Sequence, residues 1–162
     1  MTYKNILVTG AKGQLAKDIK EIVDNGKSDN NFFFKSKEAL NILKKEEVAA
    51  FVVEKEIHII INCAAYTNVD LAEDNIQLAN QVNYEAVAHL AEVCKKYDVF
   101  LIHISTDYVF GEALKQTPYN ELDATGPTSV YGKSKLKGEN YIINSNINYI
   151  ILRTSWLYSS FG

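Results

Sequence analysis

A tyrosine and a lysine four residues apart, Tyr131 and Lys135, are the side chains in this sequence best suited to proton transfer. Residues i and i+4 of a helix share a face, so this phenol and this ammonium can point into one cleft. A phenol has an ordinary pKa near ~10, and a nearby cation lowers that pKa because it stabilises the phenolate. Many solvated helix faces carry such a pair by chance. With suitable partners, we expect Tyr131 to donate a proton to a carbonyl that is being reduced.

A segment with two glycines, Thr9 to Ala16, could bind a pyrophosphate. Gly10 and Gly13 lie between a predicted strand and a predicted helix, where glycine allows a tight turn and close approach of backbone to phosphate. N–H groups and the dipole at a helix start favour negative charge there. The spacing is Gly-x-x-Gly-x-x-Ala rather than Gly-x-Gly-x-x-Gly, and the third position, which serves helix–strand packing, also tolerates alanine. The alternative is a glycine-rich turn that binds nothing.

The residues after the second predicted strand bear on the choice of dinucleotide. NAD requires an acid there for the adenosine ribose, whereas NADP requires a cation for its extra phosphate. The sequence reads Lys35-Ser36-Lys37, and the first acid is Glu38. This order favours NADPH, with Lys37 as the cation. The alternative is that both lysines are simply solvated.

Two further polar segments follow predicted strands, at the strand ends where ligands of open α/β sheets bind. Residues 105–110 include Thr106, whose hydroxyl could hydrogen-bond and polarise a substrate carbonyl. Residues 62–67 include small side chains that would let a flat ring lie close to the backbone. The alternative for the first segment is an ordinary turn or cap. The glycine segment, the Tyr131–Lys135 pair, residues 105–110 and residues 62–67 are all predicted at the strand ends. We therefore expect these four sets of residues to line one crevice.

Short apolar runs alternate with stretches of helical period, which predicts an α/β fold with a Rossmann-like, doubly wound parallel sheet and helices on both faces. The predicted strands are 3–9, 32–34, 57–61, 99–104 and 149–152, and the predicted helices are 15–23, 46–56, 75–97 and 129–143. A polar loop is predicted over 112–128. No linker or repeat divides residues 1–162, so we expect one domain.

Composition narrows the class of protein. The 162 residues are 47% hydrophobic and 23% charged, as in ordinary globular domains. With 17 Lys+Arg, 20 Asp+Glu and a net charge of −3, the chain shows no footprint of a nucleic-acid partner. It has two cysteines and three histidines without metal-ligand spacing, no signal-peptide core and no stretch long enough to span a membrane. We therefore expect no metal, no membrane and a cytoplasmic location.

Taken together, these motifs resemble the extended short-chain dehydrogenase/reductase family, and within it the reductases of nucleotide-linked keto sugars. The resemblance runs through the chain in order. It is carried by residues 8–10 (Val-Thr-Gly), 13–15 (Gly-Gln-Leu), 62–73 (Asn-Cys-Ala-Ala-Tyr-Thr-Asn-Val-Asp-Leu-Ala-Glu), 105–110 (Ser-Thr-Asp-Tyr-Val-Phe), 118–119 with Glu121, 131–136 (Tyr-Gly-Lys-Ser-Lys-Leu) with 138–139, and 152–156 (Leu-Arg-Thr-Ser-Trp). The segments around residues 65–70 and 153–156 are not generic to the superfamily.

The resemblance implies hydride transfer from NADPH, or NADH, to the keto carbon of a nucleotide-linked 6-deoxy-4-keto sugar. Tyr131 would donate the proton, Lys135 would bind the nicotinamide ribose, and Thr106 would hydrogen-bond the keto oxygen. The implied cofactor-binding residues are Gly10, Gly13, Gln14, Leu15, Lys37, Asn41, Ile42, Ala65, Tyr66, Thr67, Tyr131 and Lys135, and the implied substrate-binding residues are Val69, Thr106, Asp107 and Trp156. The sequence departs from the family at Ala16, at Cys63, where alanine is usual, and at Asn41, where aspartate is frequent.

The family also places most of its sugar-nucleotide pocket in a smaller C-terminal domain, whereas this sequence stops at Gly162, just after the fifth predicted strand. We therefore expect an NAD(P)-binding fragment, residues 1–162, that lacks the C-terminal substrate domain. Family members form dimers, some with Mg²⁺ at contacts outside these residues. Two alternatives stay open: an NAD-retaining epimerase or dehydratase of nucleotide sugars, and a non-catalytic, cofactor-binding regulatory subunit.

Overall fold

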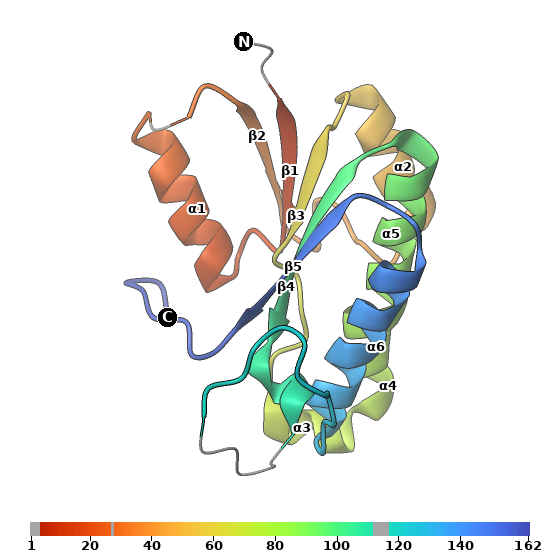
Figure 1. Cartoon of the computed structure of the whole chain (residues 1–162). Helices are drawn as coiled ribbons and strands as arrows, with labels where there is room; N and C mark the ends of the chain where they lie inside the picture. The colour runs from red at the N-terminus through yellow and green to blue at the C-terminus, as the bar shows by residue number, and fades with distance from the viewer. Residues whose placement is uncertain (1–3, 27, 112–116) are drawn as a thin grey trace.

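The computed structural model describes residues 4–26, 28–111 and 117–162. In this part of the chain, five parallel strands form one sheet in the order β2-β1-β3-β4-β5 (Figure 1). The strands are β1 (Asn5–Thr9), β2 (Asn31–Lys35), β3 (Ile59–Asn62), β4 (Phe100–Thr106) and β5 (Tyr149–Thr154). The order reverses between β1 and β3, and such a switch point opens a crevice at the carboxyl ends of the strands. The predicted fold class is confirmed.

Helices cover both faces of the sheet, as Figure 1 shows, with α1 on one side and α2, α5 and α6 on the other. The helices are α1 (Gln14–Asp24), α2 (Lys45–Glu54), α3 (Val69–Asp74), α4 (Ile76–Asn80), the π-helix η1 (Gln81–Glu85), α5 (Ala86–Tyr97), the 3₁₀ turn η2 (Asp107–Phe110) and α6 (Val130–Asn144). None of those described has the length and apolar character needed to cross a membrane.

The alternation of side chains along each strand divides the core into two layers. On the α2–α5–α6 side, Leu7, Ile60 and Leu101 are fully buried in a cluster that also includes residues of these helices. On the α1 side, Ile6 and Val8 pack with Ala16 in a smaller cluster. Burying apolar side chains on both faces of the sheet explains why the strands read as nearly continuous apolar runs.

The helix predicted over 75–97 has the correct extent, but it is not one continuous α-helix. The structure divides it into α4, η1 and α5, because the turn of η1 follows a π-helical path. The sequence did not predict α3, whose first turn is capped by the Asn68 side chain, which accepts a hydrogen bond from the N–H of Leu71. Most other predicted boundaries differ by one or two residues. The predicted strand start at Tyr3 and loop residues 112–116 lie outside the described residues.

Candidate active site

A cavity of about 600 Å³ opens at the carboxyl ends of the strands, within the usual size range of small-molecule sites. Its wall is formed by the β1–α1 turn, the residues after β2 and β3, the end of β4, and α6. All twelve predicted cofactor-binding residues line it: Gly10, Gly13, Gln14, Leu15, Lys37, Asn41, Ile42, Ala65, Tyr66, Thr67, Tyr131 and Lys135. The structure therefore brings together segments that lie far apart in the sequence, as the strand-end argument predicted.

The β1–α1 turn depends on glycine at one position. Gly10 has φ +68°, and a Cβ atom there would lie 2.7 Å from the backbone nitrogen of Ala64. The turn thus crosses directly against the backbone that follows β3. No side chain caps the start of α1, so its dipole can favour an anion beside Gln14 and Leu15. Ala16 is fully buried against β1, which is the packing expected at the third position of the motif.

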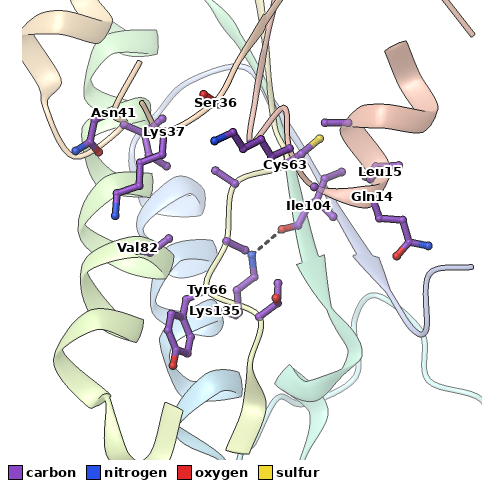
Figure 2. Close-up of a pocket in the computed structure, with 18 of the residues that line it drawn as sticks. Gln14, Leu15, Ser36, Lys37, Asn41, Cys63, Tyr66, Val82, Ile104 and Lys135 are labelled. Carbon is purple, nitrogen blue, oxygen red and sulfur yellow. Dashed lines mark hydrogen bonds between the residues drawn. The ribbon is translucent and has the colours of Figure 1, made fainter. Parts of the chain in front are cut away.

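A cation and an acid share the wall after β2. Lys37 lines the cavity and is exposed, whereas Lys35 lies with its Nζ 4.9 Å from the centre of the Phe51 ring. Glu38 accepts a hydrogen bond from the Ser36 hydroxyl at 2.7 Å and pairs with Lys12 Nζ at 3.0 Å. These hydrogen bonds, that from Ser36 first, lower the pKa of Glu38 to about 2. Figure 2 shows Lys37 beside Asn41, away from Gln14 and Leu15.

The predicted proton-transfer pair lies on α6, which begins where Ser129 accepts a hydrogen bond from the N–H of Gly132. Tyr131 and Lys135 are both buried and both line the cavity. Lys135 is only 1% exposed, and its Nζ donates to the carbonyl oxygen of Ile104 at 2.7 Å (Figure 2). The helix therefore places both side chains in one cleft, as their spacing predicted.

The expected effect of Lys135 on the phenol is wrong for this structure. The pKa of Tyr131 is raised, first by burial and further by the charges of Asp107 and Tyr108, although a hydrogen bond with Thr106 lowers it in part. Burial also lowers the pKa of Lys135 to about 8. A buried lysine that holds its proton weakly is a poor source of positive charge for the phenol, so desolvation outweighs the effect inferred from spacing.

The residues after β4 form a short hydrogen-bonded turn. The Thr106 hydroxyl donates to Asp107 Oδ1 at 3.1 Å and accepts from the N–H of Tyr108 at 3.2 Å. Ser105 lines the cavity, and its buried hydroxyl has no partner among the described residues. An unpaired buried hydroxyl is costly, so a molecule in the cavity could gain a hydrogen bond from it. The sequence analysis gave Ser105 no role of its own.

The predicted substrate-binding residues are less well gathered than the cofactor set. Thr106 and Asp107 lie next to Tyr131 but outside the cavity wall. Val69 packs with Ala72 and Tyr131 in a small apolar cluster, and Trp156 is 77% exposed, with a left-handed backbone (φ +45°). The structure thus assembles the cofactor and proton-transfer residues, and leaves Val69 and Trp156 outside the cavity.

Sequence reasoning missed Asn83, a buried residue of η1 that holds the cavity wall in place. Its side-chain oxygen accepts from the N–H of Tyr66 at 2.9 Å, and its amide nitrogen donates to the Tyr66 carbonyl and to the Ser134 hydroxyl, both at 3.0 Å. The available signal was an asparagine in an otherwise helical apolar pattern, which requires partners when buried. Thr154 and Leu157 also line the cavity and were not predicted.

Cys63 lines the cavity, and His103 is a residue of β4. Burial raises the pKa of the Cys63 thiol to about 12, so it stays protonated and resembles a small apolar side chain. His103 is fully buried in the core. Across the described ranges, no group of three or more His, Cys, Asp or Glu side chains is placed to hold a metal ion.

Comparison with known proteins decides the family, because the RmlD substrate binding domain model matches residues 4–162. The chain belongs to this RmlD family. It is 40% identical over 158 residues to the dTDP-4-dehydrorhamnose reductase of Aggregatibacter actinomycetemcomitans, a match that covers 97% of this chain and 53% of the relative. It is 41% identical to the reductase of the same name from Sinorhizobium fredii, covering 97% of this chain and 52% of the relative.

Solved structures of RmlD-type reductases have the same fold. The dTDP-4-dehydrorhamnose reductase of Bacillus anthracis, crystallised with NADP, matches with a TM-score of 0.92 and 36% identity over 99% of this chain and 56% of that one. The Clostridium acetobutylicum protein gives a TM-score of 0.90 at 36% identity, over 96% and 55% of the two chains. The chain therefore spans about half the length of the relatives it matches.

Proposed function

We propose that this chain binds NADPH in the cavity and supplies the proton-transfer groups for reduction of dTDP-4-dehydrorhamnose to dTDP-L-rhamnose. The observation that carries the proposal is that one cavity is lined by the glycine turn, by Lys37 and by the Tyr131–Lys135 pair. The names of the relatives and the NADP bound to the Bacillus anthracis protein support this choice of substrate and cofactor.

The cavity wall offers a partner for each part of the dinucleotide. The start of α1 and the backbone at residues 13–15 would hold the pyrophosphate, and Lys37 would face the extra phosphate of NADPH. Asn41 and Ile42 would flank the adenine, residues 65–67 would line the path of the cofactor, and Lys135 would bind the nicotinamide ribose. When bound, the cofactor supplies the hydride that the keto carbon accepts.

Tyr131 would supply the proton. As the carbonyl carbon gains the hydride, its oxygen takes the Tyr131 Oη proton, which leaves an alcohol and a tyrosinate. The raised pKa keeps Tyr131 protonated beforehand, as a general acid requires. The Thr106 hydroxyl, which donates to Asp107 Oδ1 in this structure, would turn to donate its one hydrogen to the keto oxygen. Such an acid contributes a factor of about 10²–10⁴ to the rate.

Residues 1–162 would form an NAD(P)-binding domain. Because Val69 and Trp156 lie outside the cavity, we place much of the sugar-nucleotide site against protein beyond this domain. Asp107, beside Tyr131, would contact the substrate. The protein would act as a homodimer in the cytoplasm.

The experiment compares Tyr131→Phe with Tyr97→Phe, a control at the end of α5 outside the cavity. NADPH oxidation with dTDP-4-dehydrorhamnose, and the Kd of NADPH, are measured for both variants and for the unchanged chain. We expect Tyr131→Phe to lower the rate about 10²-fold or more while the Kd for NADPH changes less than about twofold. If the unchanged chain oxidises NADPH in a sugar-dependent reaction, an unchanged rate in Tyr131→Phe would show that Tyr131 is not the proton donor.

A further inference from the structure

A row of buried polar side chains crosses the sheet just below the cavity. Thr9, Asn62 and His103 are paired in register on β1, β3 and β4, and each is at most 1% exposed. The Thr9 hydroxyl donates to Asn62 Oδ1 at 2.7 Å, and Asn62 Nδ2 lies 3.0 Å from His103 Nδ1. His103 Nε2 then lies 3.4 Å from Lys135 Nζ. The row thus leads from the residue before Gly10 to the buried lysine of the proposed site.

The hydrogen bonds fix which ring nitrogen of His103 carries the proton. The backbone N–H of Ala64 donates to Asn62 Oδ1 at 3.3 Å, so the amide nitrogen of Asn62 is the group that faces His103. An amide NH₂ can only donate, and His103 Nδ1 must therefore accept. Burial lowers the pKa of His103 well below its ordinary value, so the ring is neutral. Its one proton is on Nε2.

This tautomer points an N–H group at the nitrogen of Lys135. An ammonium has only donors and cannot accept that hydrogen, whereas a neutral amine can accept it and still donate to the Ile104 carbonyl. We infer that the Thr9–Asn62–His103 row stabilises the neutral amine of Lys135, which makes His103 a positioning residue that sets the protonation state of that lysine. The inference deepens the proposed function and rests on it for its catalytic meaning.

The other titratable groups around Lys135 do not reverse this effect. Glu139, one helical turn further along α6, favours the ammonium, but Arg153 holds its carboxylate through bonds of 3.1 Å from Nε and 2.7 Å from an Nη. Cys63 is a protonated thiol, because burial raises its pKa to about 12. Tyr131 is a protonated phenol for the same reason. Burial of Lys135 itself lowers its pKa to about 8, in the direction that the row also favours.

The test is an NMR titration of the isotope-labelled chain without cofactor or sugar. Long-range ¹H–¹⁵N correlations report the tautomer of His103, and the side-chain signal of Lys135, assigned by its loss in Lys135→Arg, reports the midpoint of its titration. Asn62→Leu frees His103 Nδ1 without adding a charge. Asn83→Leu is the matched control, because it also removes a buried asparagine but one that bonds to Tyr66 and Ser134 instead.

We expect the Nε2–H tautomer in the unchanged chain and in Asn83→Leu. In Asn62→Leu, the proton can move to Nδ1 and the ammonium gains an acceptor, so the Lys135 midpoint should rise by about one pH unit or more. A protonated Nδ1 in the neutral ring of the unchanged chain would overturn the inference, even if Asn62→Leu does not fold. An unchanged midpoint in folded Asn62→Leu would also overturn it. Neither result depends on NADPH or turnover, so failure here is distinguishable from failure of the proposed function.

Discussion

At the scale of single residues, Lys135 combines near-complete burial with a 2.7 Å hydrogen bond to the carbonyl oxygen of Ile104 and a longer contact of 3.4 Å with His103. Burial disfavours its charged form, and by the inference above the N–H of His103, 3.4 Å away, does so as well. The binding of a dinucleotide, which carries several negative charges, would favour the ammonium again. Cofactor binding at and above about pH 8 should therefore be coupled to proton uptake at this lysine.

The stability of the folded chain should depend on pH through Lys135. Its pKa falls from 10.5 to about 8 on folding, so between these values the unfolded chain binds more protons and the free energy of unfolding rises with pH. Cys63 and Cys94, whose pKa is raised to about 12, act oppositely above pH 9. Urea unfolding is measured for the unchanged chain and for Lys135→Met across this pH range. Because both chains contain the two cysteines, comparing them cancels the cysteine contribution. The free energy of unfolding should rise less with pH in Lys135→Met. Equal pH slopes would contradict the lowered pKa.

Lys37 should discriminate between the two nicotinamide cofactors. If it contacts the extra phosphate, Lys37→Ala should weaken NADPH binding about tenfold, equivalent to about 1.4 kcal/mol, and leave NADH binding nearly unchanged. Lys95→Ala, on α5 outside the cavity, is the charge-matched control. Calorimetric titrations of both cofactors give the ratio. A ratio that is equal in all three chains would show that Lys37 is solvated and does not contact this phosphate.

The side chains that meet in the site could be predicted from the sequence. The direction in which their pKa values shift could not. The spacing of Tyr131 and Lys135 is a helix property and can be read directly. The direction of each pKa shift depends on burial by segments far away in the chain, among them the backbone of Ile104. In the same way, the hydrogen-bond partners of Asn83, Tyr66 and Ser134, lie 17 and 51 residues away in the sequence. The residues next to Asn83 therefore could not predict its role.

At the scale of elements, the β1–α1 turn determines how closely two neighbouring strand ends approach each other. Gly10→Ala should lower the free energy of unfolding by more than the about 1–2 kcal/mol of left-handed backbone strain, because its Cβ would also meet the Ala64 backbone at 2.7 Å. Gly26→Ala is the matched control, since φ there is +70° and nothing lies within 4 Å of the added atom. Denaturant unfolding compares the two variants. Equal losses would show that the turn does not need the close approach.

The buried ion pair between α6 and β5 should hold these elements together. Arg153→Leu would leave the fully buried Glu139 carboxylate without its partner, which typically costs about 3–5 kcal/mol. Adding Glu139→Leu removes the unpaired charge, so the double variant should recover much of that loss in urea unfolding. If Arg153→Leu alone has almost no effect on stability, the pair does not contribute as the geometry suggests.

Elements were predictable where the apolar pattern was strong. The strands buried on both faces and the helix that carries Tyr131 follow from local periodicity. The π-turn of η1 did not, because residues 75–97 keep a helical pattern, whereas the bonds of Asn83 in this turn are made to residues far away in the sequence. The short helix α3 was also not predicted, because its six residues are too few to show a helical period of apolar side chains.

At the scale of the whole molecule, the strand order explains why distant segments share one cavity. Parallel strands all end at the same edge of the sheet, and the reversal of order between β1 and β3 opens that edge beside the glycine turn. That the residues predicted to bind the cofactor would line one cavity could therefore be inferred from sequence. The surroundings of Trp156 and Val69 could not be inferred in this way. Their roles came only from the family resemblance, and neither residue lines the cavity.

The most direct test of the account is a titration of the ¹⁵N-labelled chain with NADPH, followed residue by residue. Saturable binding should move the backbone amide signals of residues 10–15, 37–42 and 65–67 and leave those at the opposite edge of the sheet, near His58 and Asp98, unchanged. The absence of saturable shifts in the cavity residues, or shifts concentrated at the opposite edge, would contradict the claim that this cavity is a dinucleotide site.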